Sequence, residues 1–186
     1  MNAQVNQFGV TLVELLVVIT VAAILMSIGI PSYRYVTTAN RISGEINGLL
    51  GDVQFARYEA IKEGLPVTIC PAQTATSVTC DTQNTWAEGW IVLSNPVSAS
   101  QGAVLRRQLP FSTFNSNDTL TSNGGVQSLI FNREGFATGL GGIGTVTFSL
   151  HDSTSNAAYT RCLMVSAAGA AATVASGKTL FTVTCS

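Results

Sequence analysis

The sequence predicts an α+β protein in which one long N-terminal helix packs on a C-terminal antiparallel β-sheet. Three observations support this class. An apolar run fills residues 10–30, and an amphipathic pattern of helical period continues to residue 64. Residues 65–186 then alternate between short β-type runs and turn residues. With 186 residues, the chain has room for one modest domain and an anchor.

The charge balance disfavours one broad class of partner, nucleic acid. Charged residues make up 10% of the chain, hydrophobic residues 46%, and the formal net charge is −1. Soluble domains usually carry about 25% charged residues. No strong positive field is expected from this composition, so bulk electrostatics does not favour nucleic acid.

Residues 10–30 read VTLVELLVVITVAAILMSIGI and contain a single charge, Glu14. As a helix this segment would extend about 31 Å, enough to cross a bilayer core. A secretory signal peptide would show a basic start and a small-x-small cleavage site. The first nine residues, MNAQVNQFG, hold no Lys or Arg, and no such site precedes the domain. The segment is therefore predicted to stay in the working protein as a single transmembrane helix.

The orientation of this span rests on two opposed signals. Arg34 and Arg41 follow it and no basic side chain precedes it, which by the positive-inside rule places the C-terminal side in the cytoplasm. Four cysteines in the remainder favour an oxidising compartment such as a periplasm. A large C-terminal domain crosses a membrane largely regardless of a few charges. We therefore expect a periplasmic C-terminal domain on an inner-membrane anchor.

Glu14 is the unusual residue of the apolar segment, because an unpaired carboxylate inside a membrane costs about 2.5 kcal/mol or more. It can stay wet if it lies near the headgroups. Alternatively it can pair with an amine, either four residues earlier or on a neighbouring copy. An α-amino group at Val10, created by cleavage after Gly9, would supply that amine. Glu14 can be hydrated before assembly and paired with an amine after it.

Residues 9–16, GVTLVELL, resemble the processing motif of type IV prepilins. The resemblance implies that a prepilin peptidase cuts after Gly9 and methylates the new N-terminus at Val10. It also implies an assembly role for Glu14, which would be fifth in the mature chain. The chain departs from the family pattern at two points: Val10 replaces the usual Phe, and the leader, residues 1–9, is not basic.

Residues 31–64 predict an amphipathic continuation of the helix, which Gly64 and Pro66 should end. The charged residues of this segment mostly fall off its apolar stripe. Three glycines weaken the helix by about 1 kcal/mol each relative to Ala. They either mark close packing against a sheet or simply leave the helix soft. The stripe consists of Ile42, Ile46, Leu49, Leu50, Val53, Ala56 and Ala60, and the glycines are Gly44, Gly48 and Gly51.

Beyond Pro66 the sequence predicts seven strands separated by loops rich in Gly, Ser, Asn, Thr and Pro. We see no repeat and no second domain boundary, so residues 65–186 are predicted to form one β-rich globular domain. The expected strands cover residues 67–70, 89–93, 104–109, 127–131, 145–150, 161–165 and 180–184.

The four cysteines form two pairs that are local in sequence, Cys70 with Cys80 and Cys162 with Cys185. Four cysteines allow three connectivities, and the sequence alone does not choose among them. We favour the two local disulfides, with free buried thiols as the alternative. A metal site is disfavoured, because it would need tighter spacing such as C-x₂-C and histidine ligands, and the chain has one histidine.

Several further segments resemble the GspH/FimT family of minor pilins and pseudopilins. Residues 57–64 (RYEAIKEG) and 67–70 (VTIC) are similar to that family's helix end and following strand. Trp86, the GWIV run at residues 89–92 and FNREG at residues 131–135 also fit. The resemblance implies a pilin fold.

No arrangement of residues predicts catalysis or a cofactor. His151 and Asp152 are adjacent, so they do not readily form a positioned acid–base pair on one strand face. Arg106 and Arg107 should point to opposite faces of a strand and serve as a solvated edge or a filament contact. Some family members bind DNA through a C-terminal G-R-x-R motif. The equivalent residues here, 169–172, read GAAA and lack the arginines, which disfavours DNA binding.

The sequence therefore predicts a minor type IV pilin that is processed by prepilin peptidase and primes or tips a pilus filament. Its expected partners are other pilins or pseudopilins through the N-terminal helix, the peptidase and an inner-membrane assembly platform. A minor pseudopilin of a type II secretion system is the alternative within the same class. The others are a pilus-tip DNA-uptake receptor and a membrane-tethered periplasmic enzyme.

Overall fold

A computed structural model describes residues 11–186 except 75, 85, 99–100 and 115–116. Its first element is α1 (Leu12–Glu63), a helix of 52 residues that continues through Pro31. Thr11 caps its start, since the Thr11 hydroxyl accepts a hydrogen bond from the backbone amide of Glu14 at 3.2 Å. Gly64 ends it with φ +68°, the left-handed conformation that terminates many helices. The predicted helix and its C-terminal boundary are confirmed.

The chain divides into two compact units, Met1–Thr38 and Ala39–Ser186. In the described part of the first unit, α1 follows the capping Thr11 and includes every residue from Leu12 on. The second unit contains the rest of α1 and all the strands.

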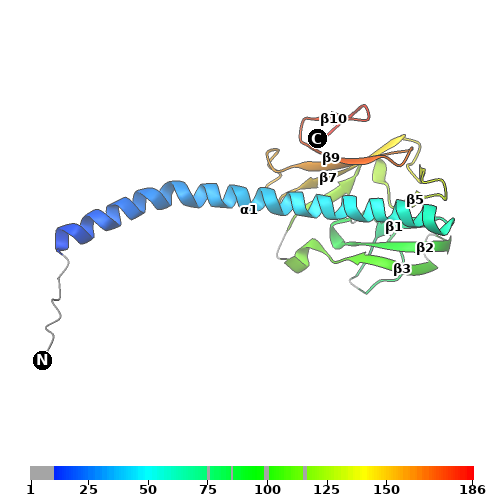
Figure 1. Ribbon diagram of the computed structural model, residues 1–186, viewed down its shortest axis with the longest axis horizontal. Helices are drawn as coiled ribbons and strands as arrows, with labels where there is room; N and C mark the ends of the chain where they lie inside the picture. Colours follow the sequence, from blue (N-terminus) through cyan, green and yellow to red (C-terminus); the bar gives the residue numbers. More distant parts are fainter. Residues whose placement is uncertain (1–10, 75, 85, 99–100, 115–116) are drawn as a thin grey trace, which may run out of the picture. The chain divides into compact units, whose positions relative to one another are not determined.

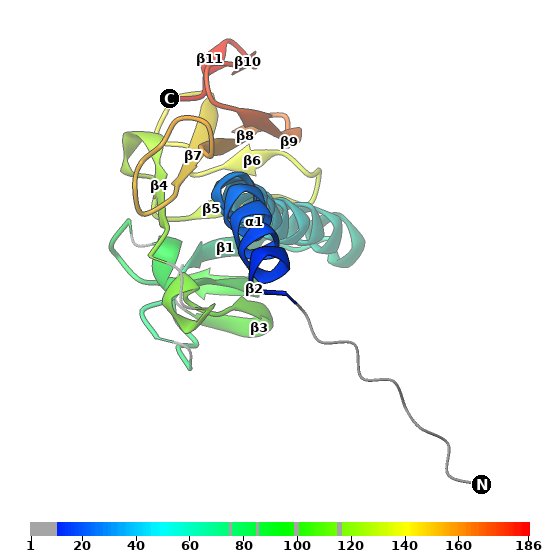
Figure 2. The same ribbon diagram turned by 90° about the vertical axis from the view of Figure 1, so that its left-hand side faces the viewer.

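The second unit holds two antiparallel sheets and a small hairpin (Figure 1). The first sheet has the strand order β3-β2-β1-β5-β6 and the second has the order β4-β7-β8-β9. Figure 2 shows β2 and β3 on one side of α1 and β8 and β9 on the other. The strands are β1 (Val67–Pro71), β2 (Trp90–Ser98), β3 (Gln101–Gln108), β4 (Thr119–Ser122), β5 (Leu129–Phe131), β6 (Ala137–Thr138), β7 (Thr145–His151), β8 (Arg161–Ser166), β9 (Ala171–Ala175), β10 (Thr179–Leu180) and β11 (Val183–Thr184).

Six of the seven predicted strands correspond to β1, β2, β3, β5, β7 and β8. The seventh, at residues 180–184, is wrong: Phe181 and Thr182 have φ of 49° and 69°, so the chain turns there between β10 and β11. Strands β4, β6 and β9 are not among the predicted strands. Strand β9 reads AATVA, and its alanines carry little β-propensity.

The core lies between α1 and the inner faces of both sheets. Trp86 contacts Phe148 edge to face with ring centroids 4.7 Å apart, and Trp90 meets Phe111 at 6.0 Å. Each fully buried apolar side chain contributes about 1.5–3 kcal/mol to folding. The stripe on α1 is confirmed apart from two details: Leu50 is only half-buried, and Glu59 takes a buried place. The buried α1 residues are Ile42, Ile46, Leu49, Val53, Ala56, Glu59 and Ala60.

The glycines of α1 do not pack against a sheet. A Cβ added at Gly44, Gly48 or Gly51 would meet no atom within 4 Å, and all three residues are exposed. The close-packing interpretation is therefore wrong. Gly44 and Gly48 instead line an open groove that also includes Gln108 and Phe111.

Candidate functional site

The processing segment begins at the N-terminal end of α1. Gly9 and Val10, the predicted cleavage and methylation residues, lie outside the described residues. Glu14 lies in the first turn of α1, three residues after the capping Thr11. Thr11 and Glu14 thus match the T-x-x-E spacing of a helix-capping box, a signal the sequence analysis missed. At this position the carboxylate is also favoured by the positive end of the helix dipole.

The helix that follows presents apolar side chains on every side. Its most apolar 18-residue window has a mean hydropathy of 2.6, and none of that window is buried. By length and composition it is the one helix in the described part of the chain that could cross a membrane. The hydroxyls of Thr20 and Ser27 donate to the carbonyls of Val17 and Ile24, at 2.8 and 2.7 Å. These polar groups therefore need no water, as an apolar environment requires.

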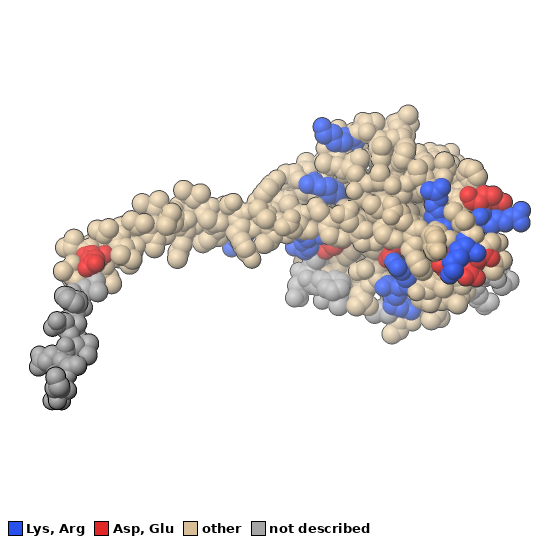
Figure 3. Space-filling model, in the orientation of Figure 1, with Lys and Arg blue, Asp and Glu red and all other residues tan. Residues whose placement is uncertain are grey.

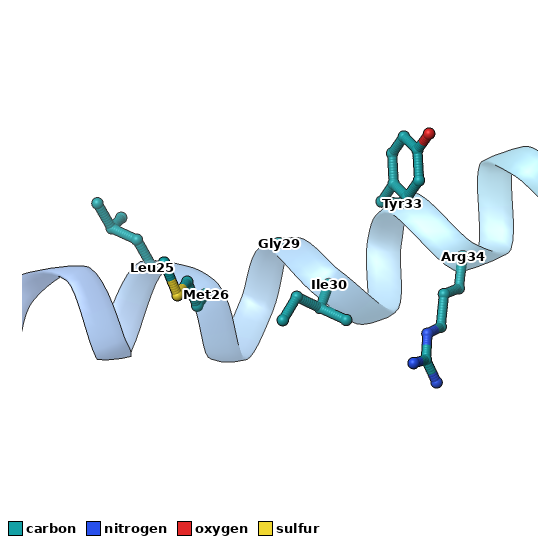
Figure 4. Close-up of a pocket in the computed structure, with 6 residues that line it drawn as sticks. All are labelled: Leu25, Met26, Gly29, Ile30, Tyr33 and Arg34. Carbon is teal, nitrogen blue, oxygen red and sulfur yellow. The ribbon is translucent and has the colours of Figure 1, made fainter.

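Figure 4 shows a shallow groove on this helix. It is open and apolar and is lined by Leu25, Met26 and Ile30 around Gly29, where an added Cβ would meet nothing within 4 Å. Tyr33 and Arg34 close it at its C-terminal end and point to different sides of the helix. Aromatic and basic side chains at the end of an apolar helix are typical of a membrane–water boundary. The groove holds no nucleophile or acid–base pair, so it offers contact area rather than chemistry.

Charge is distributed unevenly over the surface (Figure 3). The face shown of the described N-terminal unit is almost entirely uncharged, whereas the visible Lys, Arg, Asp and Glu side chains gather over the β-rich unit. Glu14 is the one acidic residue among residues 11–38. The N-terminal unit is therefore suited to an apolar environment and the second unit to water.

Within the second unit, the charged residues of α1 bind the strands beside it. Arg41 donates two hydrogen bonds to Asp118, at 2.8 and 2.7 Å, and the Asp118 side chain is fully buried. Asp52 accepts hydrogen bonds from the Trp90 indole at 2.8 Å and from Arg106 at 3.1 Å. Arg41 and Asp52 lie beside the apolar stripe and not on it, as predicted. Their hydrogen bonds also fix α1 to the β-rich unit.

The four cysteines form two disulfides in the structure. Cys70 bonds to Cys80 and Cys162 bonds to Cys185. The first ties the end of β1 to the loop that follows it. The second joins β8 to the chain just after β11, and the buried Cys162, Met164 and Cys185 form a small separate cluster there.

The acid and base candidates do not assemble a catalytic site. His151 Nδ1 lies 3.0 Å from the Thr160 hydroxyl. Burial raises the pKa of Asp152, but hydrogen bonds from the Thr154 hydroxyl and from the amides of Asn156 and Thr154 outweigh it. Together with the nearby Arg41 they hold that pKa below its usual value. Asp152 thus anchors the β7–β8 turn, and the described residues hold no group of three His, Cys, Asp or Glu side chains that could bind a metal.

The candidate cationic residues are also dispersed. Arg106 lies over the Phe55 ring at 3.8 Å while it binds Asp52, so it is a helix contact as well as an edge residue. Residues 169–172, in place of the DNA-binding motif, form the β8–β9 turn and the start of β9. They contribute no cation there.

Comparisons with known families find two matches. The family model described as "Type II transport protein GspH" matches residues 45–169. The model described as "Prokaryotic N-terminal methylation motif" matches residues 5–30. Together the two models span both the apolar segment and most of the β-rich unit. No curated protein matches the chain.

Solved structures of similar fold include two crystal forms of the type IV minor pilin FimU from Pseudomonas aeruginosa, strain PAO1. The first is 20% identical with a TM-score of 0.50, covering 74% of this chain and 90% of FimU. The second is 19% identical with a TM-score of 0.51, covering 76% of this chain and 89% of FimU. At this identity the likeness supports the fold, a long helix on antiparallel sheets.

Proposed function

This chain belongs to the GspH family of type II transport proteins, and we propose that it is a minor pilin-type subunit that is cut after Gly9 and assembled into a filament. In this proposal residues 1–9 are the leader and residues 10–30 the transmembrane and filament-core helix. Residues 31–64 continue the helix, and residues 65–186 form the periplasmic domain.

One observation carries the proposal: the methylation-motif match at residues 5–30 includes the first part of α1, from Leu12, whose large apolar side chains the described residues leave exposed. Large apolar side chains from Leu12 to Ile30 are half or more exposed. A soluble monomer rarely leaves such a surface open. A bilayer before assembly and a bundle of like helices after it would both cover it.

Glu14 gives this assembly a register. When apolar helices pack against each other, a carboxylate between them loses its water, and an unpaired buried charge is strongly unfavourable. A positively charged α-amino group at Val10 of a neighbouring subunit would compensate for that loss. Subunits displaced along the filament would leave Glu14 unpaired, so the pair selects one axial position. Methylation at Val10 leaves the amine able to carry its positive charge.

The partners follow from this mechanism. The apolar helix would pack on other pilins or pseudopilins in the filament. The prepilin peptidase and an inner-membrane assembly platform would act on the subunit before that. The chain would reside in the inner membrane with its domain in the periplasm, and later in the filament. We assign it no cofactor, metal or catalytic residue.

A minor pseudopilin of a type II secretion system is the second candidate, and the description of the matching family favours it. The two candidates share the fold, the processing and the helix packing, and differ in the machinery that uses the filament. Deleting the gene and measuring twitching or piliation against protein secretion would separate them. A DNA-uptake receptor is disfavoured, because residues 169–172 lack the cations that phosphates require.

N-terminal sequencing and intact-mass measurement of the protein recovered from membranes tests the proposal directly. We expect a chain that starts at N-methylated Val10 and lacks four hydrogens, two for each of the two disulfides. A chain that still starts at Met1 in cells with active prepilin peptidase would contradict the proposal.

A further inference from the structure

The outer edge of β9 is open. In the order β4-β7-β8-β9 this strand is the last, and it pairs with β8 on one side. Figure 2 shows β9 at the margin of its sheet. An edge strand carries a row of backbone donors and acceptors that another strand can pair with.

The hydrogen bonds that flank β9 identify which backbone groups face outward. Ser166 donates to Ala170 at 2.9 Å, and Ser176 donates to Thr160 at 3.3 Å. Hydrogen-bonded pairs alternate along an antiparallel ladder. With the register Leu163↔Thr173, the residues of β9 that bond to β8 are therefore Ala172 and Val174, and the residues whose N–H and C=O groups point away from β8 are Ala171, Thr173 and Ala175.

Most of these outward groups have no backbone partner in the described part of the chain. The carbonyl of Ala175 accepts from Lys178 at 3.1 Å. Described backbone hydrogen bonds reach neither the carbonyls of Ala171 and Thr173 nor the amides of Ala171, Thr173 and Ala175. Three backbone N–H groups and two backbone C=O groups therefore lie along the edge, on every second residue. This is the spacing at which an added strand forms hydrogen bonds.

The other edges of the two larger sheets, at β3, β4 and β6, are interrupted. On β3, Arg106 and Arg107 and two register shifts against β2 interrupt pairing. On β4, the Asn84 side chain bonds both the amide and the carbonyl of Ser122. On β6, which has two residues, the Ala137 amide donates to Ala167. Such devices are how soluble proteins prevent strand addition. Strand β9 itself carries no charge and no proline.

The surroundings of β9 fit the side chains of an added strand. A cavity of about 170 Å³ lies between α1 and β9, lined by Ser43, Asn47, Arg161, Thr173 and Ala175 among others. A residue placed opposite Thr173 would direct its side chain toward this cavity, because cross-strand neighbours share a face. The cavity is small and mostly polar, so it suits a short polar side chain.

We propose that the outer edge of β9 takes up an extended, uncharged strand from a neighbouring pilin-type subunit, which bonds to the backbone of Ala171, Thr173 and Ala175. Main-chain bonds would provide the affinity, and the cavity beside Thr173 would provide the selectivity. The inference rests on the proposed function, since it needs a neighbouring subunit in the filament. It adds a contact in the β-rich unit that is separate from the apolar helix.

Thr173→Pro and Thr173→Val form a matched pair of variants of the full chain. Both remove the Thr173 hydroxyl and its 3.5 Å contact with Asn47. Only Thr173→Pro removes an amide, and that amide faces outward, so the pairing with β8 is kept. Near-equal melting temperatures and intact disulfides would show that both variants fold.

The readout is the amount of each variant in sheared filaments, by quantitative mass spectrometry. We expect Thr173→Pro to fall about tenfold below wild type and Thr173→Val to stay within about twofold, as one or two lost hydrogen bonds imply. Amide exchange gives a second readout: the Thr173 amide should exchange about tenfold more slowly in filaments than in detergent-solubilised chain.

The outcomes separate this inference from the function it rests on. Equal incorporation of both variants, or unchanged exchange at Thr173, overturns strand addition while leaving the processed subunit in place. Absence of the wild-type chain from filaments overturns both proposals. Self-association of the solubilised chain that Thr173→Pro abolishes would support strand addition and would identify the neighbouring subunit as a second copy of this chain.

Discussion

Arg57, near the end of α1, donates from Nη1 to the carbonyl oxygen of Gly169 at 2.9 Å, a contact between residues 112 positions apart. Gly169 lies in the β8–β9 turn with φ +76°, directly against a second turn at Gly135 with φ +80°. The Ala137 amide donates to Ala167 at 2.9 Å beside them. The helix, the edge of the first sheet and a hairpin of the second therefore meet at one junction.

A side chain at this junction should destabilise the fold. A Cβ at Gly169 would lie 2.1 Å from the Gly135 oxygen and 2.9 Å from Arg57 Nε, and φ there is positive. We expect Gly169→Ala to lower the free energy of unfolding by more than about 2 kcal/mol. Gly48→Ala is the control: on the open face of α1 it should raise stability by about 0.5–1 kcal/mol. Chemical denaturation measures both, and equal stability of the two variants would contradict the junction.

The disulfides should differ in what they contribute. The Cys162–Cys185 bond closes a separation of 23 residues and the Cys70–Cys80 bond one of 10. Chain-entropy arguments give about 3 kcal/mol for each, with the longer loop worth more. Thermal unfolding should therefore show a larger loss for Cys162→Ser than for Cys70→Ser. Unchanged melting of Cys162→Ser would count against a native bridge.

Glu14 should matter for assembly and not for cleavage. Glu14→Ala removes the carboxylate that would pair with an α-amino group, so we expect normal processing and at least about tenfold less subunit in filaments. Glu14→Asp keeps the charge on a shorter side chain and should recover part of the loss. Immunoblots of membranes and of sheared filaments measure the two steps separately. Normal incorporation of Glu14→Ala would refute the charge pair.

Processing itself should depend on Gly9. A bulky residue there, as in Gly9→Leu, should leave the full-length precursor in the membrane, as the prepilin resemblance implies. Gln7→Leu, a change of the same kind inside the leader, should be processed normally. Mass spectrometry distinguishes the two by the N-terminal residue. A mature chain beginning at Val10 in Gly9→Leu would refute the leader assignment.

Acid should weaken the β7–β8 turn through Asp152. Its pKa is lowered in the folded chain, so its carboxylate stabilises the fold above the unfolded pKa of about 3.9 and that contribution is lost as the pH falls through the folded value. Asp152→Asn should be less stable than wild type at neutral pH, and the difference should shrink below about pH 4. Denaturant midpoints across this range test it, and a constant difference would contradict the assignment.

Local patterns in the sequence were enough to predict much of the fold. The apolar run and the stripe through Ile42, Ile46 and Leu49 predict α1, because a helix repeats every 3.6 residues whatever it packs on. Six strands follow from short β-type runs between turn residues. The two disulfides join cysteines that are near in sequence. The hairpin at Phe181 was missed because two non-glycine residues adopt positive φ there.

What the sequence by itself determined is therefore the anchor, the buried face of the helix, the family resemblance and most of the strands, each a matter of spacing along the chain. The tertiary structure decided which residues meet: Arg41 with Asp118 and Arg57 with Gly169, separated by 77 and 112 positions. It also decided that AATVA, strand β9, lies at the edge of its sheet. Those features depend on the strand orders β3-β2-β1-β5-β6 and β4-β7-β8-β9, and a strand order follows from packing between distant segments, which no local period encodes.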